Sequence, residues 1–79
     1  MNGAEPTAPS EFLLCVENGD YPESLEVGKL YPVLADTDAA RHELVRVIDE
    51  SGEDYLYPRR YFVEIDLPTE ARKALRRAS

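Results

Sequence analysis

The apolar residues of this chain come in short runs that turn-forming residues separate. Even the long runs, such as Phe12–Val16, hold only a few residues. Runs of this length are typical of β-strands, whereas a membrane-spanning helix needs about 20 apolar residues. The sequence therefore predicts a mainly β protein with no membrane contact. No signal-peptide core follows a basic start, so we expect a cytoplasmic protein.

Five strands are predicted from runs that are apolar or rich in β-branched residues. They cover residues 12–16, 29–34, 44–48, 55–57 and 61–65. A turn at residues 18–20 and Pro22 predict a long irregular loop that runs to Gly28. Residues 36–42 are predicted to be a polar connection, and Gly52 is available for the positive φ of a hairpin turn.

Both ends of the chain differ from this pattern. Residues 1–10 have no periodicity and are predicted to have no fixed structure. Residues 67–79 predict a helix, because Pro68 suits its first position and basic residues gather toward its end. Its apolar stripe is too short to be stable alone, so the helix docks either on its own domain or on a partner or second copy. Residues 11–66 complete the single domain.

The net charge of −7 is divided unevenly along the chain. Residues 1–58 hold 13 acidic and 3 basic side chains, whereas residues 59–79 hold 3 acidic and 6 basic side chains. An acidic body repels phosphate backbones, so nucleic acid is an unlikely partner and a protein or peptide with basic residues is favoured. The alternative explanation of the same acidity is that it only keeps the protein soluble. We expect a monomer or a weak homodimer.

The sequence assigns no catalytic residue, metal ligand or cofactor. Cys15 is the single cysteine and lies in an apolar run, where free cysteines behave as small hydrophobic residues. The single histidine, His42, lies in a polar segment. Asp36 and Asp38 lack the glycine and the later glutamate of a calcium-binding loop. Motifs of metalloproteases, serine hydrolases and phosphate-binding loops are missing, so the sequence predicts a protein that is not an enzyme.

Two segments carry a resemblance to SH3 domains. Residues 25–33 resemble the SH3 pattern of an apolar residue, a turn ending in glycine and an alternating strand. Residues 58–62 resemble the SH3 segment in which proline and tyrosine precede the last strand. The chain also looks like small uncharacterised bacterial proteins with an SH3-like core. This resemblance implies a five-stranded SH3-like barrel with a short C-terminal α-helix and a disordered N-terminal arm.

The resemblance also implies a candidate binding surface. Pro58 and Tyr61 match positions that line the SH3 groove, and the acidic loop from Asp20 to Glu26 matches the loop that receives a basic side chain. The chain lacks tryptophan, on which proline-rich ligands pack, so the expected ligand is instead a basic segment of a partner protein. The candidate binding residues are Asp20, Tyr21, Glu23, Glu26, Pro58 and Tyr61.

Two questions remain open from the sequence. In a strand, Tyr55 and Tyr57 share one face and Leu56 lies on the other. The SH3 register turns Tyr57 inward and Leu56 outward, whereas hydrophobicity alone buries Leu56. The second question concerns the basic C-terminal helix, which gives an alternative function. In that alternative, the protein is a nucleic-acid-associated accessory protein that binds through this helix.

Overall fold

The computed structural model describes the backbone of residues 11–78 and the side chains of residues 11–77. Its strands are β1 (Glu11–Cys15), β2 (Leu30–Leu34), β3 (Leu44–Ile48), β4 (Asp54–Pro58) and β5 (Phe62–Val63). Its helices are α1 (Thr37–Arg41), a 3₁₀ helix (Arg59–Tyr61) and α2 (Thr69–Ala78). The prediction for residues 1–10 lies outside the described residues.

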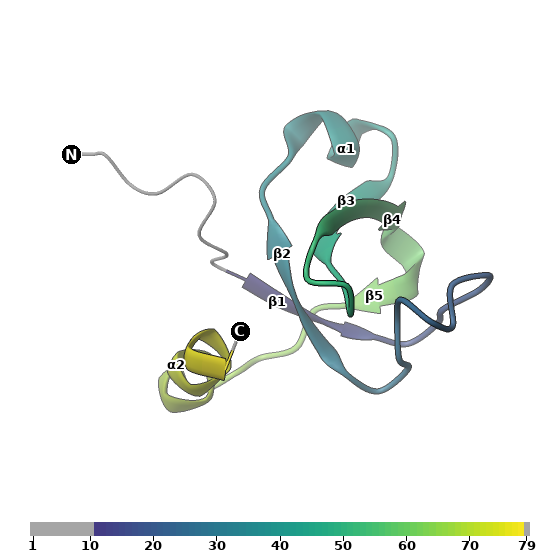
Figure 1. The fold of residues 1–79 in the computed structure, drawn as a ribbon. Helices are drawn as coiled ribbons and strands as arrows, with labels where there is room; N and C mark the ends of the chain where they lie inside the picture. The colour runs from purple at the N-terminus through teal and green to yellow at the C-terminus, as the bar shows by residue number, and fades with distance from the viewer. Residues whose placement is uncertain (1–10, 79) are drawn as a thin grey trace.

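The strands form one curled antiparallel sheet in the order β4-β3-β2-β1-β5 (Figure 1). The mainly β class, the five strands and the C-terminal helix are therefore confirmed. The strand ladders leave β4 and β5 as the two edges of the sheet, so they do not close it into a barrel.

The largest differences from the predicted elements lie in the connections. The polar connection of residues 36–42 contains α1, which the side chain of Asp36 caps by accepting a hydrogen bond from Ala39 N at 2.9 Å. A helix of five residues is too short to show an apolar period, so only the capping aspartate signals it. The predicted last strand, 61–65, is shortened to β5, because Tyr61 ends the 3₁₀ helix.

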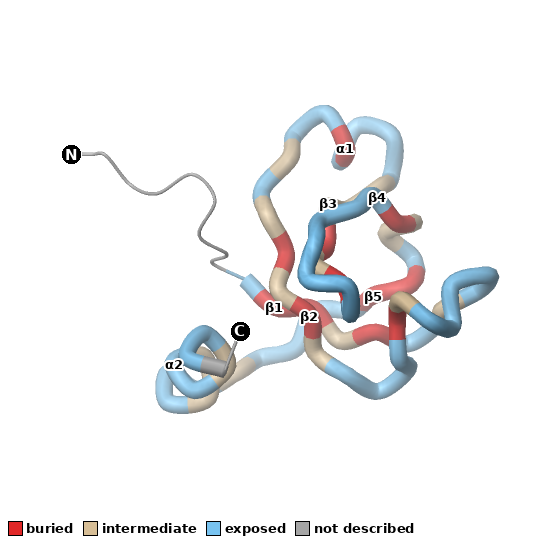
Figure 2. Tube along the Cα trace, in the orientation of Figure 1, coloured by how far each residue is buried: buried red, intermediate tan, exposed pale blue. Residues whose placement is uncertain are grey.

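The core lies on the inner face of the curled sheet, to which the strands contribute alternate residues. Figure 2 shows the buried segments along the strands in red. Residues of all five strands contribute to it, together with Leu25 of the first loop and Tyr61 of the 3₁₀ helix. Its buried members are Leu13, Cys15, Leu25, Tyr31, Val33, Val47, Tyr57, Tyr61 and Phe62. Cys15 is fully buried, as expected for a structural cysteine, and burial raises the pKa of its thiol.

The register of β3 and β4 answers the question about Leu56. Tyr57 pairs with Val45 and is 3% exposed, whereas Leu56 pairs with Arg46 on the outer face and is 43% exposed. Tyr57 therefore points inward and Leu56 outward, which is the first of the two expectations. In the turn before β4, Gly52 has φ 83°, as the sequence predicted.

Helix α2 follows an extended segment after β5 and lies beside β1, away from the curled part of the sheet (Figure 1). None of its described side chains is buried, although Ala71, Arg72 and Leu75 are half-buried. Arg72 lines a cavity together with Phe12 of β1. No helix in residues 11–78 has the length and apolar character needed to cross a membrane.

Candidate binding surface

The first loop, residues 16–29, joins β1 to β2, contains the acidic loop of residues 20–26 and is held by its own hydrogen bonds. Asn18 Nδ2 donates to Leu25 O at 3.1 Å, and Tyr21 N donates to Asn18 O at 2.7 Å. At its far end, Glu26 N donates to the hydroxyl of Tyr31 at 2.8 Å. Because Leu25 is fully buried, the backbone of the loop is also anchored in the core.

A cluster of tyrosines lies under this loop. The ring of Tyr21 meets the ring of Tyr57 edge-on with centroids 5.1 Å apart, and its centroid lies 6.4 Å from that of Tyr61. Tyr57 and Tyr61 are buried, whereas Tyr21 is 43% exposed. Of the candidate residues Tyr21 and Tyr61, the structure therefore presents only the ring of Tyr21 at the surface.

Tyr61 is buried because the loop backbone passes directly over it. A Cβ atom added at Gly19 would lie only 2.8 Å from Cζ of Tyr61. Only glycine permits this approach, and the φ of Gly19, +50°, also favours glycine. Tyr61 thus supports the loop from below, and its ring does not line an open groove.

The candidate carboxylates of the loop lie in solvent. The side chains of Asp20, Glu23 and Glu26 are exposed, and within residues 11–78 they make no hydrogen bond or ion pair. An unpaired carboxylate beside an exposed tyrosine suits a guanidinium or ammonium group, which can stack on the ring and pair with the acid.

A cation that lies over a tyrosine ring and also pairs with a carboxylate already occurs twice in the molecule. The guanidinium of Arg60 lies over the ring of Tyr61, with its Cζ 5.1 Å from the centroid, and pairs with Glu17 at 3.8 Å. Likewise, Nζ of Lys29 lies 5.5 Å from the centroid of Tyr31 and 2.6 Å from Glu50 Oε2. Arg60 and Lys29 therefore each bind a tyrosine ring and a carboxylate at the same time. Among the described residues, Tyr21 and the unpaired carboxylates of the acidic loop have no such cation.

Pro58, the remaining candidate residue, lies in a different place. It lines a cavity of about 820 Å³ at the end of the sheet where β2 ends and β3 begins, and no residue of the acidic loop lines this cavity. The structure thus brings Tyr21 and Tyr61 together under the acidic loop but separates Pro58 from them.

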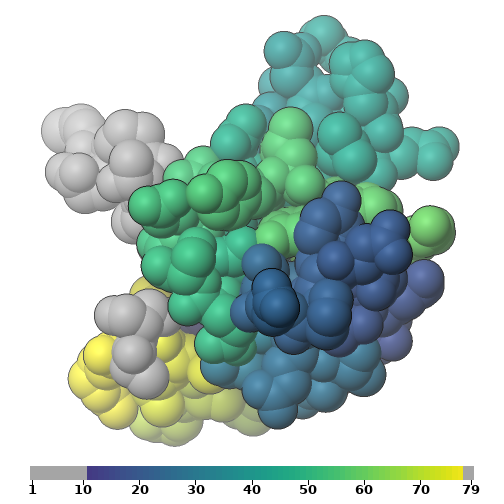
Figure 3. Space-filling view, turned by 45° about the vertical axis from the view of Figure 1, so that its right-hand side comes forward, coloured from purple at the N-terminus to yellow at the C-terminus, as the bar shows by residue number. Residues whose placement is uncertain are grey.

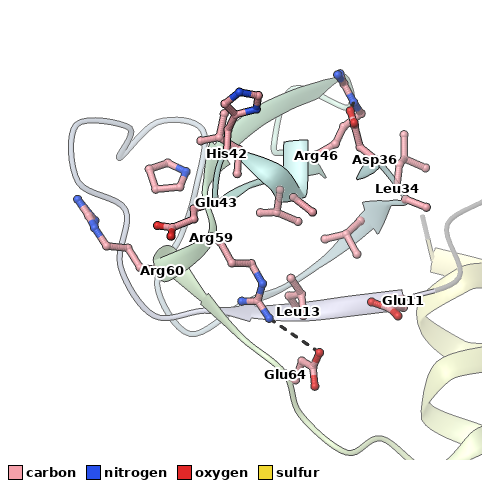
Figure 4. Close-up of a pocket in the computed structure, with 16 residues that line it drawn as sticks. Glu11, Leu13, Leu34, Asp36, His42, Glu43, Arg46, Arg59, Arg60 and Glu64 are labelled. Atoms are coloured by element: carbon pink, nitrogen blue, oxygen red, sulfur yellow. Dashed lines mark hydrogen bonds and ion pairs between the residues drawn. The ribbon is translucent and has the colours of Figure 1, made fainter. Parts of the chain in front are cut away.

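This end cavity has an apolar floor and a charged rim (Figure 4). Leu13, Val33 and Val45 belong to the floor. On the rim, Arg59 points toward Glu64, with its Nη2 3.9 Å from Glu64 Oε2, whereas Arg60 points away (Figure 4). The sequence does not predict this cavity, because its lining comes from four strands that only the fold brings together. Its apolar floor suits an aliphatic side chain.

Two buried polar groups, the carboxylate of Asp49 and the hydroxyl of Tyr57, hold the turn between β3 and β4 in place. Asp49 is 6% exposed and accepts hydrogen bonds from the hydroxyl of Tyr57 and from N and Oγ of Ser51. Burial by itself raises the pKa of Asp49, but these hydrogen bonds outweigh it and the pKa lies below its usual value. Burial and the bond to Asp49 raise the pKa of Tyr57 to about 12.

Glu50, the neighbour of Asp49, is tied to the start of β2. It accepts hydrogen bonds at 2.6 Å from both Lys29 Nζ and the hydroxyl of Tyr31, and these bonds lower its pKa. Asp49 is therefore a buried anchor of the hairpin, whereas Glu50 is exposed and anchors it through Lys29 and Tyr31.

The described part of the chain contains no group of three or more histidine, cysteine, aspartate or glutamate side chains placed to hold a metal ion. His42, in the lining of the end cavity, has its Nδ1 3.0 Å from the carbonyl oxygen of Asp38. The position of the His42 ring is therefore explained by its contact with α1.

Comparison of the chain with protein-family models, with curated proteins and with solved structures finds no match. The function is therefore argued from the surface itself.

Proposed function

We propose that this protein is an SH3-like interaction module that binds a basic segment of a partner protein through its acidic loop. Support for the SH3-like architecture comes from the sheet order β4-β3-β2-β1-β5 with a long loop after β1 and a tight hairpin between β3 and β4. A 3₁₀ helix directly before the last strand is a further similarity.

The observation that carries the binding proposal is the exposed ring of Tyr21 beside unpaired carboxylates. The loop is fixed by the burial of Leu25, so Asp20 and Glu23 remain near Tyr21 without losing side-chain freedom to an internal partner. A partner's arginine or lysine would stack on Tyr21 and pair with one of these carboxylates. Such contacts contribute about 0.5 to 2 kcal/mol each, so binding requires several basic residues on the partner.

Arg60 and Tyr61 provide an internal precedent for this contact. Arg60 already combines the face of the Tyr61 ring with the carboxylate of Glu17. A ligand that carries arginines would repeat this arrangement on Tyr21, using geometry that the chain itself adopts.

The test is a titration of the full chain with a fluorescent arginine-rich peptide, followed by anisotropy. We expect saturable binding that weakens as salt rises, and no binding of the same peptide with citrulline in place of arginine. Tyr21→Ala and Glu23→Lys should each weaken binding several-fold. Tyr61→Ala is unsuitable because Tyr61 is buried.

The matched control is Asp38→Lys, which makes the same change of charge on α1, far along the chain from the acidic loop. Asp38 is exposed, and among residues 11–78 its carboxylate forms an ion pair only with Arg41 of its own helix, at 3.1 Å. If Asp38→Lys weakens binding as much as Glu23→Lys does, attraction to the overall negative charge explains the result and the proposed surface is wrong.

A second candidate function rests on α2. Lys73, Arg76 and Arg77 are exposed and make no ion pair within residues 11–78. This free positive charge favours a phosphate backbone as the ligand. In that case RNA or DNA binding falls steeply with salt and is lost in Arg76→Glu/Arg77→Glu, whereas Glu23→Lys leaves it intact.

A further inference from the structure

The outer edge of β4 offers backbone groups that the sheet does not use. Arg59 N donates to Glu43 O at 2.9 Å and Asp49 N donates to Glu53 O at 3.1 Å. In the antiparallel register of β3 and β4, the odd-numbered residues of β4 therefore form the hydrogen bonds to β3. The N–H and C=O groups of Asp54 and Leu56 point to the other side, where the sheet has no further strand.

The side chains along this edge are exposed and include large apolar groups. Tyr55 is 49% exposed and Leu56 is 43% exposed. Figure 3 shows the green atoms of this part of the chain at the surface, beside the blue atoms of the first loop. Edge strands commonly carry charges at their centre that prevent pairing with another chain. Here the centre of the edge is Tyr55 and Leu56, and the charged residues lie at its ends.

Those end charges have opposite signs. Glu53 precedes β4, and Asp54 is its first residue, whereas Arg59 and Arg60 follow its last. When a second copy of the strand lies antiparallel to the first, the acidic end of each copy meets the basic end of the other. A strand with this pattern is complementary to itself.

We propose that β4 pairs with β4 of a second copy of the chain in an antiparallel, two-fold symmetric dimer centred on Leu56. The two Leu56 residues face one another and exchange N–H to C=O hydrogen bonds. In this register Asp54 N–H of each copy donates to the Pro58 carbonyl of the other. Glu53 lies opposite Arg59, which exchanges its 3.9 Å contact with Glu64 for this pair. Pro58 has no N–H to return, so the pairing ends there.

The same pairing covers the exposed apolar side chains. Leu56 of each copy meets Leu56 of the other on the outer face, and Tyr55 lies opposite Tyr57 on the inner face. The other edge of the sheet is less suited, because β5 holds only Phe62 and Val63. A contact this short buries less surface than the roughly 1,200 Å² of stable interfaces, so the dimer is weak and sensitive to salt.

The first test is analytical ultracentrifugation of the full chain from about 10 µM to about 1 mM, a range that covers weak association. We expect a monomer–dimer equilibrium. Leu56→Lys places two ammonium groups face to face and should raise the dissociation constant by about tenfold or more. Val27→Lys, at an apolar side chain that follows the acidic loop and is 53% exposed, is the control and should leave the dissociation constant unchanged.

Charge reversal tests the register. Glu53→Arg and Arg59→Glu should each weaken the dimer, and the double variant should restore it, because the pair is then re-formed with its signs exchanged. Hydrogen exchange provides a backbone readout. The amides of Asp54 and Leu56 should exchange more slowly as the concentration of the chain rises, whereas those of Tyr55 and Tyr57 are protected at every concentration.

A chain that stays monomeric over the whole concentration range overturns the proposal. So does a dimer that Leu56→Lys leaves intact, which would place the interface elsewhere, for example on α2. A double charge variant that dimerises no better than Arg59→Glu alone refutes the register. None of these outcomes depends on whether the acidic loop binds a basic peptide.

Discussion

Replacing Tyr57 by phenylalanine tests how the buried turn beneath the acidic loop is stabilised. The substitution removes only the hydroxyl group, whose hydrogen bond to Asp49 is buried, and leaves the ring in the core. A hydrogen bond to a buried charged group contributes about 1.5 to 3 kcal/mol. A domain of this size is stable by roughly 4 to 12 kcal/mol, so the loss is large. Tyr57→Phe should therefore lower the melting temperature by about 10 °C.

The effect should also depend on pH in a defined direction. The folded state holds the pKa of Tyr57 at about 12, above the value of about 10 in an unfolded chain. The stabilisation is therefore fully present below about pH 10 and is lost as the pH rises toward 12. A shift of this size corresponds to about 2 to 3 kcal/mol, of which burial of the hydroxyl is the larger cause and the hydrogen bond to Asp49 the second.

Urea unfolding followed by circular dichroism measures both effects. At pH 7 the wild type should be more stable than Tyr57→Phe, and the difference should shrink between about pH 10 and about pH 12. Tyr55→Phe is the control, because its hydroxyl donates to Glu53 at the surface and its removal should shift the urea midpoint little. A difference below about 0.5 kcal/mol at pH 7, or one that stays constant up to pH 12, would refute the reasoning.

Three further predictions concern single positions of the fold. Gly19→Ala should lower the free energy of unfolding in urea by about 2 kcal/mol or more, because its Cβ meets the ring of Tyr61; Gly28→Ala, with φ +93° and open space, should cost less. Glu43 has φ 59°, so Glu43→Gly should raise the melting temperature by a few degrees, and an unchanged melting temperature would contradict the strain argument. The thiol of Cys15 is fully buried and its pKa is raised, so a thiol reagent should react only as fast as the chain unfolds; immediate reaction would show an open core.

The strands could be predicted from the sequence because their signals are local. The third strand, residues 44–48, is a β-branched run between polar segments and has the predicted bounds. The others differ by one to three residues at their ends. The short helix α1 was missed, because its buried face consists of one residue, Ala39. Burial of Leu25 was also not predicted, since a single apolar residue in a polar loop has no period to mark it.

The candidate site was predictable only in part. The acidic loop and Tyr21 lie at the surface, as a polar segment with a turn should. The burial of Tyr61 and its separation from the cavity of Pro58 follow from the path of the 3₁₀ helix, and they depend on contacts with Gly19 that are distant in the sequence. The end cavity was not predictable, because its lining comes from several strands.

The sequence by itself determined the class of this protein: short apolar runs and turn residues specify strands through local backbone preferences and the alternation of side chains. The tertiary structure alone decided which face of β4 points inward, because one residue of register exchanges Tyr57 for Leu56 and only the pairing with β3 selects between them. It also decided which acids are free. Asp49 and Glu50 are held by Tyr57, Tyr31 and Lys29, which reach the turn through the fold, whereas the carboxylates of the acidic loop are left to solvent.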